Sequence, residues 1–341
     1  MTGQHDPTEE LIEQSLTSHA AQAPSDGDLL ENVHGRLQRR RRTGRSAGAI
    51  LLAGAAVAAG IVGVNTLQNK PEDPPVTAVQ SDEWRWESYK TVEVQVPAQW
   101  GYGSGVNDPW CLVDKLRPPG VSRPGPVRAI ACGEGVVPLA YRTSSLTFGA
   151  GGRTAGVREY DHGWAEETRV VAGVTLTVFG NDETLRRRIL GSARPIAGAD
   201  GNGCTPTHPL ATRPGATPPS TGGVSSIGTV ESISVCRYST EDAVAPLLSS
   251  SQITGNAART LVDAIDAAPE GTGPNSPTLC SDQYGEEVLV LRVVGSDRDQ
   301  EVLLRYSGCN HLGTDDGATR RRLTAPVVQP LLKGPHQPTS Y

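Results

Sequence analysis

One apolar stretch constrains this chain more than any other feature. Residues 46–64 read SAGAILLAGAAVAAGIVGV, and no charged residue lies between Arg45 and Lys70. A run of this kind suits a helix of about 20 residues that crosses a hydrocarbon core about 30 Å thick. We therefore predict a transmembrane helix over residues 46–66.

Basic residues gather immediately before this stretch. Positive charge is retained on the cytoplasmic side of a membrane, and the residues after the stretch carry only Lys70 against several acids. The pattern predicts a single-pass protein of the cell membrane, with a cytoplasmic N-terminus and an extracytoplasmic C-terminus. The same cluster can contact anionic lipid head groups, which makes membrane lipid a predicted partner. The cluster consists of Arg36, Arg39, Arg40, Arg41, Arg42 and Arg45.

Two other interpretations of the stretch are weaker. A cleaved secretory signal needs a shorter leader than these 45 residues and a small-residue cleavage site after the apolar run, which is missing. A soluble cytosolic protein with a buried apolar helix would not need the abutting arginines. An uncleaved signal anchor therefore remains the preferred interpretation.

Cysteine placement agrees with this orientation. All six cysteines fall on the predicted outer side, and an even number in an exported region indicates a disulfide framework. No C-x-x-C pair is present, which argues against a zinc site. Each second cysteine follows a strand-like run, so we predict nearest-neighbour pairing, although six cysteines allow 15 connectivities. The predicted pairs are Cys111–Cys132, Cys204–Cys236 and Cys280–Cys309.

The sequence divides into segments of different composition. The leader alternates capping residues with short apolar stripes, and a proline-rich acidic tether follows the apolar stretch. Strand and helix patterns are mixed beyond it, which predicts an α+β extracytoplasmic region of two small disulfide-stapled domains. The predicted segments are a cytosolic helical leader 1–45, a transmembrane helix 46–66, a linker 67–83, outer domains 84–197 and 198–334, and a flexible tail 335–341.

Local patterns predict several elements of the first outer domain. Valines alternate with polar residues over 92–97, and a second strand pattern covers 174–179. Asp182 is a suitable cap for a helix that runs to about Gly191, with the arginines 186–188 largely outward.

The second outer domain shows similar signals. A strand is expected around Cys236, followed by helices at 241–249 and 256–267. Residues 286–294 and 301–306 read as a hairpin joined by a polar turn. Residues 320–332 are expected to form a closing helix that Pro326 interrupts.

Charge and motifs exclude several function classes. A net charge of −6 argues against nucleic-acid binding, which needs a basic face. The chain lacks a G-x-S-x-G elbow, a phosphate-binding loop and a dinucleotide fingerprint. Asp161 and His162 are adjacent in sequence, and adjacent side chains rarely point at each other. Residues 200–203 contain only the start of a calcium loop and read as a turn. We predict a protein that is not an enzyme and has no cofactor.

Aromatic residues are concentrated near the start of the outer region. Such a cluster can stack on the sugar rings of a wall polymer or line a peptide groove, and it can equally form the core of a loop-rich domain. Arginines greatly outnumber lysines, which suits bidentate carboxylate or phosphate recognition but also follows from a GC-rich genome. The candidate ligand surface is Trp84, Trp86, Trp100, Tyr102 and Trp110.

The overall layout resembles known membrane proteins. The leader contains D-P-T-E-E-L at 6–11 and D-L-L-E-N-V at 28–33, and the outer region contains V-Q-V-P-A-Q-W-G at 94–101 and P-W-C at 109–111. With these phrases the chain resembles actinobacterial single-pass membrane proteins with disulfide-rich extracytoplasmic regions, a group with no assigned chemistry. The layout is also similar to transmembrane anti-sigma factors, which implies a cytosolic protein partner. Because the leader lacks cysteine, the zinc-binding motif H-x-x-x-C-x-x-C of one anti-sigma subgroup is absent.

Two functions follow as hypotheses. The first is a non-enzymatic, membrane-anchored envelope protein whose outer domains bind a cell-wall component, a peptide or a partner protein. The second is a transmembrane regulator with a cytosolic binding leader and an outer sensor. The first is preferred because topology alone explains the features of the leader. The sequence does not determine the ligand or the oligomeric state.

Overall fold

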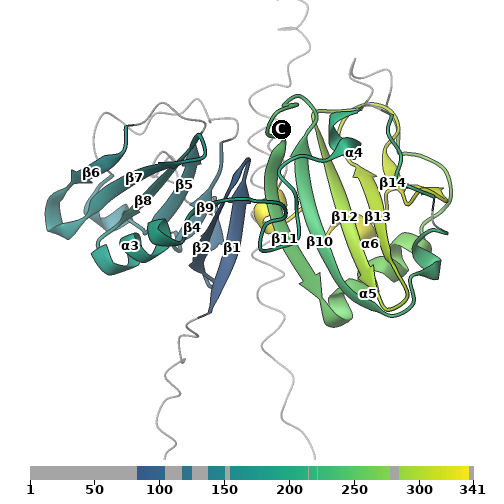
Figure 1. Cartoon of the computed structure of the whole chain (residues 1–341), viewed down its shortest axis with the longest axis horizontal. Helices are drawn as coiled ribbons and strands as arrows, with labels where there is room; N and C mark the ends of the chain where they lie inside the picture. The colour runs from purple at the N-terminus through teal and green to yellow at the C-terminus, as the bar shows by residue number, and fades with distance from the viewer. Residues whose placement is uncertain are drawn as a thin grey trace, which may run out of the picture. The chain divides into compact units, whose positions relative to one another are not determined.

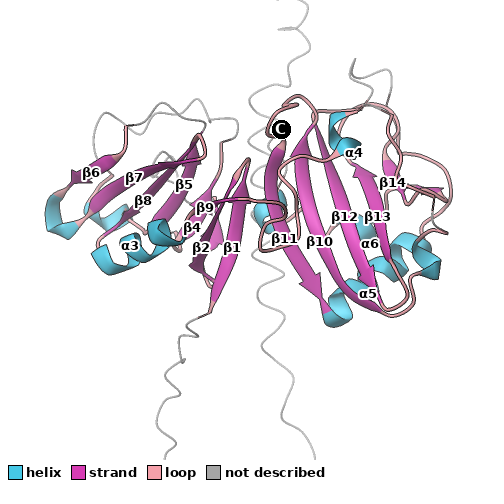
Figure 2. Cartoon of the chain, viewed as in Figure 1, coloured by secondary structure: helices cyan, strands magenta, loops and turns pink. Residues whose placement is uncertain are grey.

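The computed structural model describes residues 83–103, 117–124, 137–149, 154–213, 215–220, 222–276 and 284–337. All of them belong to one compact unit, Thr77–Tyr341. Most of the regular secondary structure in the described residues is β-strand, arranged in three sheets with few helices (Figures 1 and 2). The predicted α+β fold class is therefore wrong. Several strands were not predicted because they are too short to show an alternation of apolar and polar residues.

A three-stranded antiparallel sheet has the order β1-β2-β9. β2 was predicted correctly: its valines 92, 94 and 96 are fully buried, as a strand with one face on the core requires. The strands are β1 (Trp84–Tyr89), β2 (Val92–Pro97) and β9 (Arg194–Pro195).

A mixed sheet has the order β3-β4-β5-β8-β7-β6. β3, β4 and β5 are parallel neighbours, and the remaining pairs are antiparallel. The predicted strand at 174–179 is confirmed as β8. The strands of this sheet and the two 3₁₀ helices (η) between them are β3 (Gly101–Tyr102), β4 (Gly120–Ser122), η2 (Leu139–Tyr141), β5 (Ser145–Gly149), β6 (Gly156–Glu159), η3 (Asp161–Gly163), β7 (Ala165–Val171) and β8 (Val174–Gly180).

Helix α3 (Glu183–Ser192) packs onto these two sheets. Asp182 caps it as predicted: its Oδ1 accepts the Leu185 backbone N–H at 3.0 Å. Arg186 was expected outside but is buried and donates from Nη1 to the Gly180 carbonyl at 2.7 Å. The N-terminal core joins α3 to both sheets and includes Tyr89, Val92, Val94, Val96, Trp100, Leu146, Phe148, Leu176, Val178, Ile189 and Leu190.

A second six-stranded sheet, the C-terminal sheet, is antiparallel throughout and has the order β11-β10-β12-β13-β14-β15. The strand around Cys236, the hairpin at 286–306 and the helix at 256–267 are confirmed. The elements of this region are α4 (Pro209–Thr212), η4 (Val224–Ser226), β10 (Val230–Ser239), β11 (Leu247–Thr254), α5 (Gly255–Asp266), β12 (Glu287–Gly295), β13 (Asp299–Arg305), β14 (Gly313–Asp315), β15 (Arg320–Arg321), α6 (Ala325–Val328) and η5 (Gly334–His336).

Apolar side chains cover both faces of the C-terminal sheet. Helices α5 and α6 pack on one face (green to yellow in Figure 1) over the helix-side core, which includes Ile233, Val235, Leu261, Ile265, Leu289, Leu291, Val302 and Leu304. The opposite face carries the disulfide-side core of Ile196, Cys204, Leu210, Ala211, Cys236, Tyr238, Leu247, Val288, Val290 and Leu303. Two covered faces explain why β12 reads as a nearly continuous apolar run.

Two expectations for this region were wrong. The segment expected as a helix at 241–249 forms a turn and the start of β11, because Asp242 Oδ1 accepts the backbone N–H groups of Val244 and Ala245 at 3.0 Å each. The expected closing helix begins as strand β15, and only Ala325–Val328 is helical. Of the predicted flexible tail 335–341, the structure describes residues 335–337, and His336 among them is only 2% exposed.

The membrane prediction requires a correction. Within the ranges given above, no helix combines the length and apolar character needed to cross a bilayer. The segment 46–66 and the arginines 36–45, on which the prediction depended, lie outside those ranges, as do the leader 1–45 and the linker up to residue 82. The single-pass, cell-membrane assignment is therefore not carried further.

Candidate functional site

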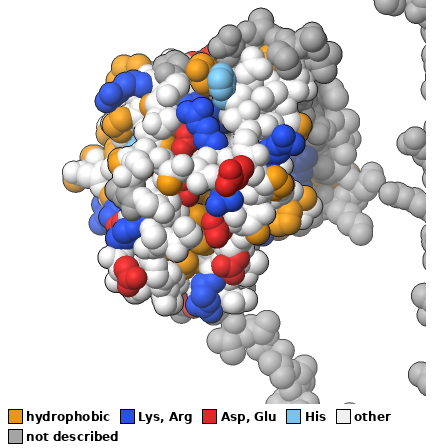
Figure 3. Space-filling model, turned by 90° about the vertical axis from the view of Figure 1, so that its right-hand side faces the viewer, with side chains coloured by type: hydrophobic (Ala, Val, Ile, Leu, Met, Phe, Trp, Pro, Cys, Tyr) orange, Lys and Arg blue, Asp and Glu red, His pale blue; other side chains and the backbone are white. Residues whose placement is uncertain are grey.

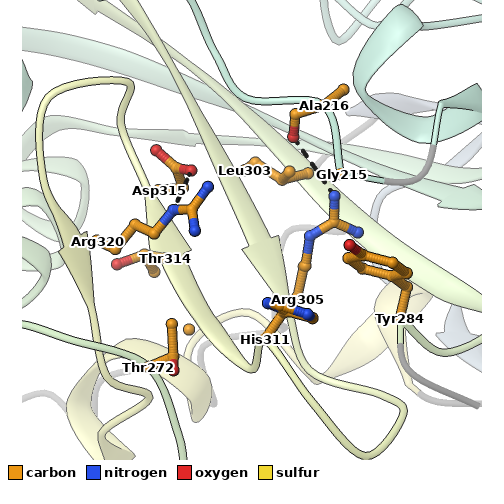
Figure 4. Close-up of a pocket in the computed structure, with 11 residues that line it drawn as sticks. Gly215, Ala216, Thr272, Tyr284, Leu303, Arg305, His311, Thr314, Asp315 and Arg320 are labelled. Carbon is orange, nitrogen blue, oxygen red and sulfur yellow. Dashed lines mark hydrogen bonds and ion pairs between the residues drawn. The ribbon is translucent and has the colours of Figure 1, made fainter.

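A small cavity lies where β13, β14 and β15 meet the segments that precede β10 and β12. Its volume is about 90 Å³. Both apolar and charged side chains reach it, the latter from neighbouring strands of one sheet edge (Figure 4). The lining residues are Gly215, Ala216, Thr272, Tyr284, Leu303, Arg305, His311, Gly313, Thr314, Asp315 and Arg320.

Arg305 is the central charged group of this cavity. It ends β13, and strand alternation places it on the face of Leu303 rather than on that of Leu304, which belongs to the helix-side core. Its cross-strand partners are Gly313 on β14 and Val288 on β12. A Cβ at Gly313 would lie 2.4 Å from the Arg321 carbonyl oxygen, so glycine is required there, and on the β14 side no side chain competes with Arg305 for the space.

The Arg305 guanidinium is held by a carbonyl group and an aromatic ring rather than by an ion pair, and Asp315 acts on its charge only at longer range. The residue is 7% exposed. Its Nη2 donates to the Ala216 carbonyl at 3.4 Å, and its guanidinium carbon lies 4.9 Å from the centre of the Tyr284 ring. In the part of the chain that the structure describes, no carboxylate lies within ion-pair distance of it. Burial lowers the pKa of Arg305, but an arginine keeps its proton at any physiological pH.

One ring lies against the Arg305 guanidinium, and a second ring stacks on the first. The Tyr284 and His311 rings stack with centroids 4.8 Å apart and planes 10° from parallel. His311 has a positive φ of 60°, a left-handed conformation uncommon for residues other than glycine, and it follows the disulfide-bonded Cys309 by two positions. The turn thus carries the imidazole over the tyrosine, which in turn packs against Arg305 (Figure 4).

A second arginine in the cavity is neutralised. Arg320 Nε lies 3.1 Å from Asp315 Oδ2, and the other oxygen of Asp315 accepts the Gly317 backbone N–H at 2.9 Å. Beyond the cavity, basic and acidic side chains are interleaved on this side of the molecule (Figure 3). Arg305 is therefore the source of net positive charge inside the cavity.

The predicted aromatic ligand surface is largely covered. Trp100 is buried in the N-terminal core, and Trp84 and Tyr102 pack against that core. Arginines lie over three of the rings. From the guanidinium carbon to the ring centre, the distance is 3.9 Å for Arg188 and Trp84, 4.4 Å for Arg194 and Trp86, and 4.8 Å for Arg85 and Tyr102. On the ring faces that these arginines cover, a sugar ring would have to displace them in order to stack. Trp110 lies outside the described residues.

The cysteine predictions are answered in part. Cys204 and Cys236 form the predicted disulfide. Cys309 is also disulfide-bonded, but its partner lies outside the described residues, as do Cys111, Cys132 and Cys280. The pairs Cys111–Cys132 and Cys280–Cys309 therefore remain predictions.

Two histidines make contacts that resemble catalytic ones. Contrary to expectation, His162 Nδ1 does contact Asp161 Oδ2, at 3.0 Å, but both side chains are exposed. His336 Nε2 lies 2.7 Å from Ser251 Oγ, and its Nδ1 lies 2.9 Å from Ser249 Oγ. Burial lowers the pKa of His336 to about 3, which makes it a weak base at neutral pH. Neither histidine lines the cavity described above.

Comparisons with known proteins add no assignment. No protein-family model matches the chain, and searches of curated proteins and of solved structures return no match either. The inferences below therefore depend on the side chains themselves. Sequence reasoning missed Arg305; the one available signal was an arginine at the end of the apolar strand V-L-L-R at 302–305.

Proposed function

We propose that this chain is a non-enzymatic binding protein that holds the carboxylate of its ligand in the Arg305 cavity. The observation that carries the proposal is a buried guanidinium that faces a cavity and has no carboxylate partner among the described residues. Burying an unpaired charge is costly, so such a group is stable only where a ligand or water meets it. A planar guanidinium matches a carboxylate with two parallel hydrogen bonds.

The size of the cavity limits the ligand. Whole small molecules occupy pockets of roughly 300–1,000 Å³. A cavity of about 90 Å³ admits a terminal group with a small body, while the remainder of the ligand lies outside. Ala216 and Leu303 offer apolar contacts for that body. The carboxyl end of a peptide or a short-chain acid has this form.

The charge of the site favours a carboxylate over a phosphate group. One arginine without an ion-pair partner among the described residues balances a single negative charge, and Arg320 is already paired with Asp315. A phosphate group with close to two negative charges would leave part of its charge unbalanced here. The regulator hypothesis gains no support, because the leader lies outside the described residues.

Matched ligands test the proposal on the full chain. N-acetylalanine carries a carboxylate on a small body, and N-acetylalaninamide has the same body without the charge. We expect NMR titration to show shifts around Arg305 with the acid and none with the amide. Arg305→Gln should weaken binding of the acid by roughly tenfold or more, since a hydrogen bond to a charged group contributes about 1.5–3 kcal/mol.

Two controls keep the test decisive. Arg292→Gln removes an exposed arginine paired with Asp299, and it should bind like the wild type. Arg305→Lys keeps the charge and covers the case in which the glutamine variant does not fold. It should bind the acid more weakly than the wild type, because an ammonium group cannot form the two parallel hydrogen bonds of a guanidinium. Equal binding of acid and amide, unchanged binding by the folded Arg305 variants, or tighter binding of inorganic phosphate would refute the proposal.

A further inference from the structure

The C-terminal end of the described chain inserts one imidazole into the protein. His336, in η5, is 2% exposed, and its two ring nitrogens contact Ser249 Oγ at 2.9 Å and Ser251 Oγ at 2.7 Å. Both serines belong to β11, the edge strand of the C-terminal sheet. A serine hydroxyl either donates or accepts, so the neutral imidazole has both of its hydrogen bonds satisfied.

The residues around His336 connect it to more than one sheet. Gly334 approaches the Tyr102 ring on β3 so closely that a Cβ would lie 3.2 Å from it. Arg237 Nη1 on β10 donates to the Gln337 carbonyl at 2.7 Å. The segment 334–337 thus contacts both the mixed sheet and the C-terminal sheet.

The charged groups around this segment disfavour a second proton on the ring. Arg123 and Arg237 are the cations that face it, and both repel an imidazolium. Their carboxylate partners are already engaged: Glu87 pairs with Arg123 at 2.6 Å and also accepts from the Tyr102 hydroxyl, and Glu287 forms a two-point pair with Arg237. In the described part of the chain, no carboxylate contacts His336 itself.

We propose that residues 334–337 form an acid-released latch, in which His336 holds the C-terminal end against β11 and β3 when neutral and releases it when protonated. The proposal is independent of the Arg305 cavity, which His336 does not line. Release would uncover Ser249, Ser251 and the Tyr102 ring and remove one connection between the two sheets.

The direction of the pH dependence follows from the two protonation states. In the latched state burial lowers the pKa of His336 to about 3, whereas a released histidine in water titrates near 6.5. Between these values the released state binds a proton that the latched state does not, so acid favours release. The population of the released state should rise about tenfold per pH unit below 6.5 and level off near pH 3.

Hydrogen exchange of the full chain tests the latch. We expect the protection of the peptide that covers residues 330–341, corrected for the intrinsic pH dependence of exchange, to fall by roughly 100-fold between pH 7.5 and pH 4.5. In His336→Gln, the protection of this peptide should no longer depend on pH, whether that protection is high or low. His162→Gln, which alters an exposed histidine outside the Arg305 cavity, should keep this pH dependence.

A second measurement covers the case in which His336→Gln leaves the segment permanently released. The imidazole resonances of His336 in the wild type should remain those of the neutral ring down to the pH at which protection is lost. Titration near pH 6.5 with protection retained would overturn the latch. Identical pH dependence of protection in the wild type and His336→Gln, or no loss of protection in the wild type, would overturn it as well.

Discussion

At some positions in this protein, neighbouring groups lie so close to the backbone that they decide which side chain fits. Gly201 lies against the face of Trp86, and its backbone N–H donates to Glu93 Oε2 at 2.6 Å. The sequence predicted a turn at 200–203, and the structure confirms one, since Asp200 Oδ1 accepts the backbone N–H groups of Asn202 and Cys204. The contact with Trp86 could not be predicted, because it joins residues more than a hundred positions apart.

Gly201→Ala should therefore destabilise the protein. A Cβ at this position would lie 2.2 Å from Trp86 Cδ1, and a tryptophan ring held by its neighbours cannot move aside without cost. We expect the free energy of unfolding to fall by about 1–3 kcal/mol, measured by chemical denaturation.

Gly191→Ala is the matched control for that substitution. Gly191 lies in α3, and among the described residues no neighbour outside the backbone of that helix would come within 4 Å of a Cβ added there. Because alanine is a better helix former than glycine, this variant should be more stable than the wild type by about 0.5–1 kcal/mol. Equal effects at the two glycines would show that the contact with Trp86 is unimportant.

At the level of elements, sequence patterns predicted several strands and helices and missed others. β2, β8, α3 and α5 repeat their apolar residues at the period of the element they form, and the β12–β13 hairpin was predicted from two apolar runs joined by a polar turn. β11 is rich in serine and threonine, and β3, β4, β9, β14 and β15 are too short to show any period. The Arg305 cavity could not be predicted either, because Ala216, Tyr284 and Arg305 come from distant parts of the chain.

The Cys204–Cys236 disulfide supports the region between α3 and β10, which contains little regular structure. Its closed loop has a sequence separation of 32, for which the chain-entropy model gives a stabilisation of about 3–4 kcal/mol. Replacing both cysteines with alanine should lower the free energy of unfolding by about that amount. The variant should also unfold with a steeper dependence on denaturant, because the uncrosslinked unfolded chain exposes more surface. If this slope is unchanged, the loss of unfolding free energy would come from altered packing in the folded state instead.

For the whole molecule, the sequence predicted two outer domains with a boundary near residue 198, yet several contacts cross that position. The Lys90 backbone N–H donates to the Leu247 carbonyl at 2.6 Å. Asn202 Nδ2 donates to the Trp86 carbonyl at 3.3 Å and to Ser250 Oγ at 2.9 Å. These contacts connect β1 to β11, and residues 77–341 form a single compact unit. The physical expectation is cooperative unfolding of both halves.

The distribution of tryptophan makes this expectation measurable. All five tryptophans, at positions 84, 86, 100, 110 and 164, precede residue 198, so their fluorescence reports on the first half, whereas far-ultraviolet circular dichroism reports on the whole chain. Removing the Cys204–Cys236 disulfide weakens the second half directly. If the contacts between β1 and β11 couple the halves, both signals should shift to lower denaturant together and remain superimposed. A fluorescence transition that stays at its wild-type midpoint while the circular dichroism separates into two steps would show that the halves unfold independently, because the hydrogen bonds across the boundary would then be too weak to transmit the loss.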